Sequence, residues 1–314
     1  MLIEKKLLNK TLYICLMVIK HIVMAGGGPA GFITYGVLKH LSKEQFWNID
    51  NIESLYGTSV GAIFSTILCL NYDWNIIDDY LIERPWDKAI DIGPQSIINT
   101  ITEAGALDAE VFTEKALEPL LSAKGLNIDI TLKEFNEINK KDLHIFTTEI
   151  NSEKLQKIDI SHTTHPEWKL VTAIATSLAY PLVFKPICID NKCYIDGGLI
   201  NNLPISDCLE DKKCDENEIL VIKNIFIKEK NDSIITKNTS LMGFLSTLFQ
   251  KMRDEIDPRD KHKDLKNIVI CLCDNLHGFN SWLDALSNKD FRKSLIDKGI
   301  LQGTMFLQYI NSLK

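Results

Sequence analysis

The feature that most constrains this chain is the stretch from Leu55 to Ile63, which reads Leu-Tyr-Gly-Thr-Ser-Val-Gly-Ala-Ile. Its pattern predicts the end of an apolar strand, a five-residue G-x-S-x-G turn and the start of an apolar helix. Glycines near Ser59 let the chain fold back sharply, which lifts the hydroxyl clear of the backbone. The corner also aims the free N–H groups of the next helix at whatever Ser59 attacks. Our hypothesis is that Ser59 is an acyl-accepting nucleophile, and a Gly/Ser-rich turn without chemistry is the alternative.

A second strand-to-helix turn lies earlier in the chain, where the residues from Gly26 to Gly31 read Gly-Gly-Gly-Pro-Ala-Gly. Residues 21–25 predict a buried strand before it, and apolar residues with helical spacing follow it. Pro29 suits the first turn of that helix, where its missing N–H does no harm. The loop therefore offers unpaired N–H groups near the positive end of a helix dipole, and such a cluster holds a negative oxygen.

Three kinds of ligand could use this loop. Gly26, Gly28 and Gly31 match the G-x-G-x-x-G of dinucleotide sites. Such a site also needs an acidic residue near the end of the second strand, but that strand ends in the serine turn and Glu53 comes too early. The absence of Gly-Lys-Ser/Thr excludes a Walker phosphate loop. The third ligand is the oxyanion of an acyl-transfer intermediate, which would use both glycine turns at once, so we rank a nicotinamide enzyme last.

A carboxylate that could serve Ser59 occurs in the segment Asp196-Gly197-Gly198, which follows the predicted strands 187–189 and 193–195. Asp-Gly between apolar runs is also a strong hairpin signal, and taken alone the segment favours that hairpin. In the chemical interpretation, Asp196 stands at a strand end, accepts the proton of Ser59 and later returns it to the leaving group.

The composition narrows the class of protein. The 314 residues are 45% hydrophobic, which is enough for one large α/β domain or two smaller ones. Lys and Arg number 35 against 42 Asp and Glu, and this net charge of −7 without a basic cluster argues against nucleic-acid binding. The eight cysteines form no C-x-x-C, so we expect buried free thiols in a reducing, cytoplasmic compartment rather than disulfides or a zinc site.

The remaining segments give an alternation of helices and strands. The apolar run Leu12–Ile19 is too short to span a bilayer and leads into the first strand, so we expect it to belong to the fold. The segment Leu241–Met252 predicts a helix packed on the domain or, in a second interpretation, an amphipathic element that meets a lipid surface. The other predicted elements are helices at 62–70, 111–121, 130–137, 170–179 and 280–314, strands at 143–148, 219–227 and 268–273, and a turn at Gly105–Asp108.

In order along the chain, these motifs resemble the patatin-like phospholipase family. The loop at 26–31 is similar to the family's oxyanion loop, and the turn at 57–61 to its nucleophile turn, with Ser59 matching the nucleophile. The segment 196–198 is similar to the one that carries the second member of a Ser–Asp dyad. Residues 175–186 and 202–204 resemble the stretches on either side of that segment.

The resemblance covers roughly residues 20 to 225 and departs from the family at one position. The family usually has Arg or Lys where this loop has Ala30, and this removes a cation near the loop. The resemblance implies a three-layer α/β/α fold with a central, mostly parallel sheet and helices on both faces. It divides the chain into an N-terminal extension (1–20), a catalytic core (21–225) and a C-terminal part of the same domain (226–314).

The resemblance also implies a lipid acyl hydrolase that needs no histidine base, metal or cofactor. Ser59 would attack the ester carbonyl with Asp196 as the base, and water would then release the acyl group. The substrate would be a phospholipid or another acyl lipid, with transient contact to a membrane surface. The oxyanion would be held by the N–H groups of Gly26, Gly27, Gly28 and Val60, and the other motif glycines are Gly31, Gly57, Gly61, Gly197 and Gly198.

Two competing interpretations stay open at this point. One is a Ser-His-Asp esterase, in which the histidine comes last along the chain, so that His262 or His277 would be the base. His262 lies among charged residues, and His277 lies in a loop-like segment. The other is a lipid-binding protein that keeps the fold without catalysis.

Overall fold

The computed structural model describes residues 18–89, 104–227, 235–239, 241–256, 265–274, 276 and 278–313. These parts of the chain form an eight-stranded sheet. Its strands are β1 (His21–Met24), β2 (Ser54–Thr58), β4 (Asp142–Glu149), β5 (Gln156–Ile160), β7 (Ile187–Ile189), β8 (Lys192–Asp196), β9 (Ile219–Ile227) and β10 (Ile268–Asp274).

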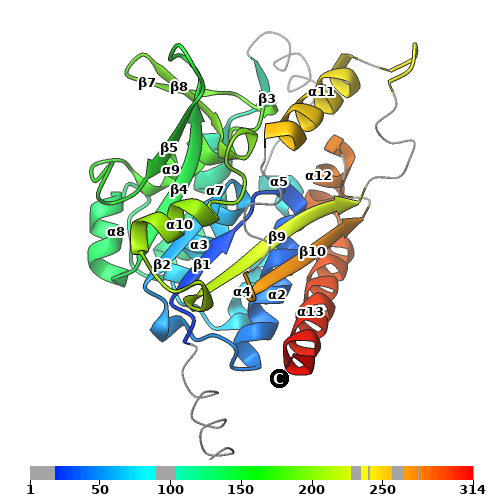
Figure 1. The fold of residues 1–314 in the computed structure, drawn as a ribbon. Helices are drawn as coiled ribbons and strands as arrows, with labels where there is room; N and C mark the ends of the chain where they lie inside the picture. The colour runs from blue at the N-terminus through cyan, green and yellow to red at the C-terminus, as the bar shows by residue number, and fades with distance from the viewer. Residues whose placement is uncertain are drawn as a thin grey trace, which may run out of the picture.

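The strands follow the order β10-β9-β1-β2-β4-β8-β7, and β5 pairs with β4 off this path (Figure 1). The five strands from β10 to β4 run parallel, whereas β5, β7 and β8 pair antiparallel. The expectation of a mostly parallel central sheet is therefore confirmed. Strand β1 lies between β2 and β9, so the order of the strands reverses at β1. In sheets of this kind, ligands bind in the crevice beyond the carboxyl end of the strand at such a point.

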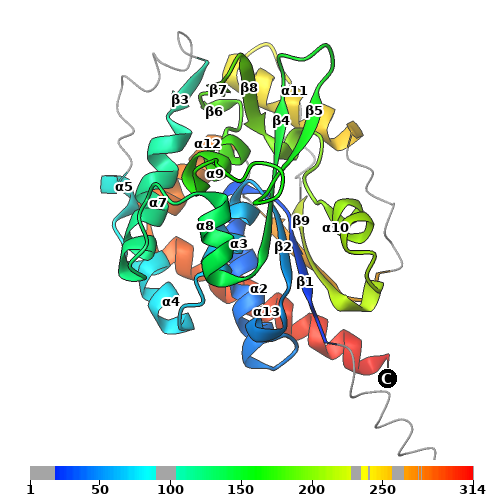
Figure 2. The same cartoon turned by 90° about the vertical axis from the view of Figure 1, so that its left-hand side faces the viewer.

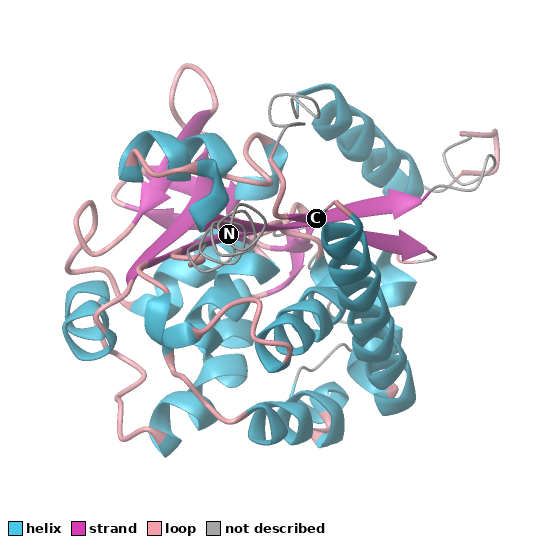
Figure 3. Cartoon of the chain, turned by 60° about the horizontal axis from the view of Figure 1, so that its bottom comes forward, coloured by secondary structure: helices cyan, strands magenta, loops and turns pink. Residues whose placement is uncertain are grey.

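Helices cover both faces of the sheet, as Figure 2 shows, and Figure 3 shows that most of them lie on one side. They include α2 (Gly31–Lys43), α3 (Val60–Cys69), α4 (Trp74–Glu83), α5 (Trp86–Ala89), α7 (Ala109–Ala123), α8 (Leu132–Asn139), α9 (Leu170–Leu178), α10 (Ile205–Lys212), α11 (Leu241–Ile256), α12 (Gly278–Ser287) and α13 (Lys289–Ser312). Short 3-10 helices are η1 (Gly28–Ala30), η2 (Ile49–Asn51), η3 (Gly197–Leu199) and η4 (Glu216–Glu218).

Strand alternation divides the core in two. Val23 and Tyr56 face α10 in the smaller cluster, and their chain neighbours Ile22 and Leu55 face the larger helical layer. Successive strand residues point to opposite faces, so a sheet with apolar residues at consecutive positions must be covered on both. The fold is accordingly a three-layer α/β/α arrangement.

The predicted turn at Gly105–Asp108 is wrong. Residues Gly105–Leu107 form strand β3, which pairs parallel with β6 (Leu182–Phe184) in a separate two-stranded sheet. Asp108 follows this strand and precedes α7. Its side chain accepts hydrogen bonds from the N–H groups at the start of that helix. The pairing joins segments more than seventy positions apart, so no local pattern indicates it.

The predicted helix at Leu241–Met252 is confirmed as α11, and its contact with lipid stays a prediction. No helix among the described residues combines the length and the apolar character that crossing a membrane would need. Helix α10 and strand β5 were missed by the sequence patterns.

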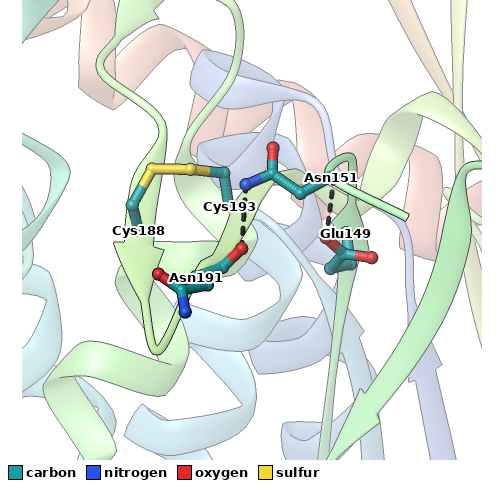
Figure 4. The surroundings of a disulfide bond; sticks show 5 residues. All are labelled: Glu149, Asn151, Cys188, Asn191 and Cys193. Atoms are coloured by element: carbon teal, nitrogen blue, oxygen red, sulfur yellow. Dashed lines mark hydrogen bonds between the residues drawn. A yellow bond between two sulfur atoms is a disulfide. The ribbon is translucent and has the colours of Figure 1, made fainter. Parts of the chain in front are cut away.

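The expectation that the cysteines form no disulfide is wrong for one pair. Cys188 and Cys193 are joined across the β7–β8 hairpin, where their Cα atoms lie 4.1 Å apart (Figure 4). They face each other because the two strands pair around a tight turn, and Asn151 donates to the carbonyl of Asn191 in that turn. The described free thiols are those of Cys69, Cys208, Cys214, Cys271 and Cys273, of which all but Cys214 are buried.

The first residue of β1, His21, is buried, and its Nδ1 lies 2.7 Å from the hydroxyl oxygen of Ser54. Burial lowers the pKa of His21 below its ordinary value. In the unfolded chain the same imidazole takes up a proton below about pH 6.5. The unfolded state therefore binds more protons as the pH falls through this value, and the folded state loses stability.

We expect the Tm to fall as the pH is lowered from about 7.5 to about 5.5, and to fall less in a His21→Asn variant. Differential scanning fluorimetry over this range measures both. Part of the dependence remains in the variant because burial also lowers the pKa of His165. An equal fall in the two proteins would contradict the assignment to His21.

Candidate active site

Ser59 stands at the corner between β2 and α3, directly after the last strand residue. Its backbone has φ 54° and ψ −125°, a conformation that residues with a side chain rarely adopt. The residue is 6% exposed. The corner has the strained strand-to-helix geometry that presents a serine hydroxyl at the top of a sheet.

The glycines of the turn allow a close approach of three backbone segments. A Cβ atom at Gly57 would lie 2.5 Å from the backbone of Gly61, and one at Gly61 would lie 2.6 Å from the carbonyl oxygen of Met24. Any larger residue would therefore push α3 away from β1 and β2. The two glycines predicted from sequence hold the corner against the end of β1.

A residue that the sequence patterns missed fixes this corner. The N–H of Ser59 donates to the hydroxyl of Ser177 on α9 at 2.8 Å, and that hydroxyl donates to the carbonyl of Phe146 on β4 at 2.5 Å. Ser177 is fully buried. The sequence signal is a serine inside an apolar helical run, where a buried hydroxyl needs partners.

Replacing Ser177 with alanine leaves the N–H of Ser59 buried without an acceptor, which costs about 1–3 kcal/mol of unfolding free energy. Urea denaturation measures the loss. Ser65→Ala is the matched control, because Ser65 is equally buried and its hydroxyl has no partner within the described structure. We expect little or no loss in the control, and equal losses in the two variants would contradict this role of Ser177.

The glycine loop follows β1, as predicted. Gly28 has φ 53° at the start of η1, and Gly31 begins α2. The N–H of Gly26 donates to the carbonyl of Asn202 at 3.3 Å. In the described parts of the chain, three other N–H groups of the candidate oxyanion hole have no acceptor, namely those of Gly27, Gly28 and Val60.

Asp196 ends β8 and precedes the 3-10 helix η3, so the hairpin alternative for this segment is wrong. Strand β8 pairs with the preceding β7 and with β4 instead. Asp196 is 4% exposed, and its Oδ1 accepts a hydrogen bond from the N–H of Gly198 at 2.6 Å. Gly197 lies against the carbonyl of Phe146, where a side chain would collide.

The registers of three neighbouring strands place Ser59 and Asp196 at the same height. Thr58 of β2 pairs with Phe146 of β4, and Thr147 of β4 pairs with Asp196 of β8. Serine and aspartate therefore flank β4 at one level. Neighbouring strands lie roughly 4.8 Å apart, so the two backbones are about 10 Å apart on either side of β4.

The side chain of Asn202 lies between the glycine loop and the segment that carries Asp196. A Cβ atom at Gly26 would lie 2.7 Å from Oδ1 of Asn202 and 3.0 Å from Cβ of Ser59. A Cβ atom at Gly198 would lie 2.7 Å from the same Oδ1 and 2.9 Å from Oδ1 of Asp196. The structure thus gathers the predicted serine, aspartate and glycines into one cluster around the Asn202 side chain.

Aromatic rings form a wall beside the glycine loop. The ring of Trp282 on α12 packs on Gly28, where a Cβ atom would lie 2.8 Å from it. The same ring contacts those of Phe184 and Phe112, with centroids 5.9 and 6.3 Å away. The nearby Ala30 is fully buried. The loop therefore borders apolar rings.

No histidine within the described residues is hydrogen-bonded to Ser59. The two histidines of the competing interpretation, His262 and His277, lie outside those residues. The same described parts of the chain contain no group of three or more His, Cys, Asp or Glu side chains that could hold a metal ion.

The Ser59 corner and the glycine loop thus stand at the carboxyl ends of two parallel strands of an α/β fold, and the buried carboxylate of Asp196 ends an antiparallel strand of the same sheet. The chain belongs to the patatin-like phospholipase family, whose model matches residues 22–209.

Two curated relatives come from viruses. An uncharacterized protein of Acanthamoeba polyphaga mimivirus is 28% identical over 188 residues, which are 60% of this chain and 61% of that protein. A protein of Invertebrate iridescent virus 6 called a probable lipid hydrolase is 27% identical over 254 residues, which are 80% and 78% of the two chains. The chain thus spans less than two thirds of the first relative.

Among solved structures, VipD from Legionella pneumophila superimposes with a TM-score of 0.54 at 15% sequence identity. The match covers 92% of this chain and 67% of VipD. It shows a shared fold.

Proposed function

We propose that this protein is a lipid acyl hydrolase that cleaves fatty-acyl ester bonds through an acyl-enzyme on Ser59. The observation that carries the proposal is the strained serine corner, which lies beside three N–H groups that lack an acceptor in the described structure and is level with a buried carboxylate. Membership of the patatin-like phospholipase family and similarity to a probable lipid hydrolase support lipid esters as the substrate class.

In the first half of the reaction, Oγ of Ser59 attacks the ester carbonyl carbon while Asp196 accepts the hydroxyl proton. The carbonyl oxygen becomes an oxyanion, and the N–H groups of Gly27, Gly28 and Val60 stabilise it. We assign Gly26 a supporting role, because its N–H already donates to Asn202. The tetrahedral intermediate then collapses, and Asp196 protonates the departing alcohol oxygen.

In the second half, Asp196 removes a proton from a water molecule, and the water oxygen attacks the acyl carbon. Collapse of this second intermediate releases the fatty acid, and Ser59 regains its proton from Asp196. The hydrogen bond from the N–H of Gly198 holds the carboxyl group in one orientation through both halves. Asp196 therefore serves first as base and then as acid without a histidine between it and Ser59.

The apolar wall beside the oxyanion loop suits an acyl chain. Trp282, Phe184 and Phe112 meet edge to face next to Gly28, where the carbonyl end of an ester would lie. An alkyl chain against these rings leaves water, which contributes roughly 0.8 kcal/mol per buried methylene group. We propose a phospholipid or another acyl lipid as the substrate, met at a membrane surface.

A fluorophosphonate probe tests the proposal, because it reacts only with an activated serine. We expect the labelled peptide to contain Ser59, and the unlabelled protein to release fatty acid from phosphatidylcholine vesicles. Parallel assays with lysophosphatidylcholine and a triacylglycerol emulsion identify the lipid class.

Two results would contradict this mechanism. Vesicle binding without labelling and without fatty acid release would favour the non-catalytic lipid-binding protein. Loss of turnover in a folded His262→Gln or His277→Gln variant would favour the Ser-His-Asp esterase.

A further inference from the structure

A polar residue interrupts the apolar face of β9. Leu220, Ile222 and Phe226 point into the larger core at alternate positions, and Asn224 takes the position between the last two. Its side chain is 9% exposed. Burying an amide among apolar residues is costly unless its donors and acceptor are paired, so its partners are informative.

Both ends of the Asn224 amide are hydrogen-bonded. Its Nδ2 donates to the carbonyl oxygen of Gly26 at 3.2 Å, and its Oδ1 accepts from the hydroxyl of Thr34 on α2 at 3.3 Å. A backbone carbonyl only accepts, so the amino group must face Gly26, and the orientation of the amide is fixed. Asn224 thus binds the peptide group that joins Gly26 to Gly27.

Because the peptide is trans and planar, the hydrogen bond to the carbonyl of Gly26 also fixes the direction of the N–H of Gly27. The C=O of Gly26 and the N–H of Gly27 belong to one planar group and point in opposite directions. The carbonyl of Gly26 points at the Asn224 side chain of β9, so the N–H of Gly27 points away from that side chain. The serine corner stands at the end of β2, and the N–H of Gly27 has no acceptor in the described structure.

We propose that Asn224 is a positioning residue that holds the Gly26–Gly27 peptide with its N–H aimed at the oxyanion. The proposal rests on the proposed acyl hydrolysis and deepens it. Asn224 lies beyond the residues 22–209 that the family model matches. The peptide joins two glycines, Gly26 and Gly27, whose missing side chains restrict its rotation little, so the hydrogen bond from Asn224 supplies the restraint.

A buried asparagine could instead serve stability alone, and the control must separate the two roles. Asn267 is 6% exposed, and its Nδ2 donates to the carbonyl oxygen of Asn217 at 2.9 Å, away from the glycine loop. It therefore matches Asn224 in burial and in the kind of bond. Asn224→Leu and Asn267→Leu each remove one amide from a backbone carbonyl and keep the number and branching of the side-chain heavy atoms.

The experiment measures kcat and KM for fatty acid release, the Tm, and inhibition by a long-chain trifluoromethyl ketone. This ketone forms a tetrahedral oxyanion on the serine, so its affinity follows the oxyanion hole. We expect Asn224→Leu to lower kcat by about 10- to 100-fold, less than or equal to the loss of a whole oxyanion donor. We expect KM to change less than about threefold, and the inhibition constant to rise by the same factor as kcat/KM falls.

Asn267→Leu should lower the Tm without changing kcat or the inhibition constant. The proposal is overturned if Asn224→Leu lowers the Tm in the same way and leaves kcat and inhibition unchanged. If Asn224→Leu does not fold, Thr34→Val replaces it, because it leaves Oδ1 of Asn224 with only the long contact to Sγ of Cys273 at 4.0 Å and so loosens the amide. We then expect a several-fold fall in kcat, with recovery in Thr34→Ser, and an unchanged kcat overturns the proposal.

The same assays separate this inference from the proposed function. An inactive Ser59→Ala protein together with a fully active Asn224→Leu protein would overturn the positioning role alone. A fully active Ser59→Ala protein would overturn both.

Discussion

Replacing Ser59 with alanine is expected to lower kcat/KM for fatty acid release by about 10⁴-fold or more, since removal of a covalent nucleophile abolishes the acyl-enzyme route. The same change removes fluorophosphonate labelling. The fold should survive, because the N–H of residue 59 still donates to Ser177 and the new side chain is smaller. Fatty acid release from phosphatidylcholine vesicles and the Tm measure the two effects.

Ser65→Ala is the control for this variant, since Ser65 is buried on the same helix that follows the corner. It should keep full activity. If Ser59→Ala releases fatty acid at the parent rate, the nucleophile lies elsewhere and the proposed mechanism fails.

Replacing Asp196 with asparagine is expected to lower kcat by about 10³- to 10⁴-fold, because an amide cannot take the proton of Ser59. The amide oxygen still accepts the hydrogen bond from Gly198, so the local structure is retained. Fluorophosphonate labelling should slow along with turnover, because the probe also needs an activated hydroxyl. Stopped assays of fatty acid release and a labelling time course measure the effect.

Asp190→Asn provides a control with the same loss of charge. Asp190 is exposed in the β7–β8 turn with φ 49°, a conformation that asparagine tolerates. It should leave turnover unchanged. Full activity in Asp196→Asn would show that another group takes the serine proton.

Much of the fold could be predicted because its signals are local. The segments that become β1–α2 and β2–α3 each show a strand pattern, a glycine turn and a helical pattern within about twenty residues. The parallel β3–β6 pair and the Cys188–Cys193 disulfide depend on which segments meet in space. A pattern read along the chain contains no information on such pairings, so both were missed.

The residues of the candidate site also fall into those with a local sequence signal and those whose role depends on distant segments. Ser59, Asp196 and the glycine loop stand at strand ends next to glycines, and this pattern of an apolar strand followed by glycines is visible in the sequence. Ser177 and Asn224 act on backbone groups of distant segments, through hydrogen bonds of 2.8 and 3.2 Å. Each follows another polar residue, Thr176 or Lys223, in a largely apolar segment, so only its hydrogen-bond partners distinguish it.

The direction of β8 has a consequence for how this site can vary. Because β8 runs against β4, its carboxyl end points down into the sheet, and the turn of the β7–β8 hairpin projects beyond it (Figure 1). The height of Asp196 is set by its pairing with Thr147 and is independent of the length of the hairpin. Homologous chains can therefore lengthen, shorten or decorate the tip of this arm while the carboxylate at its base stays in place.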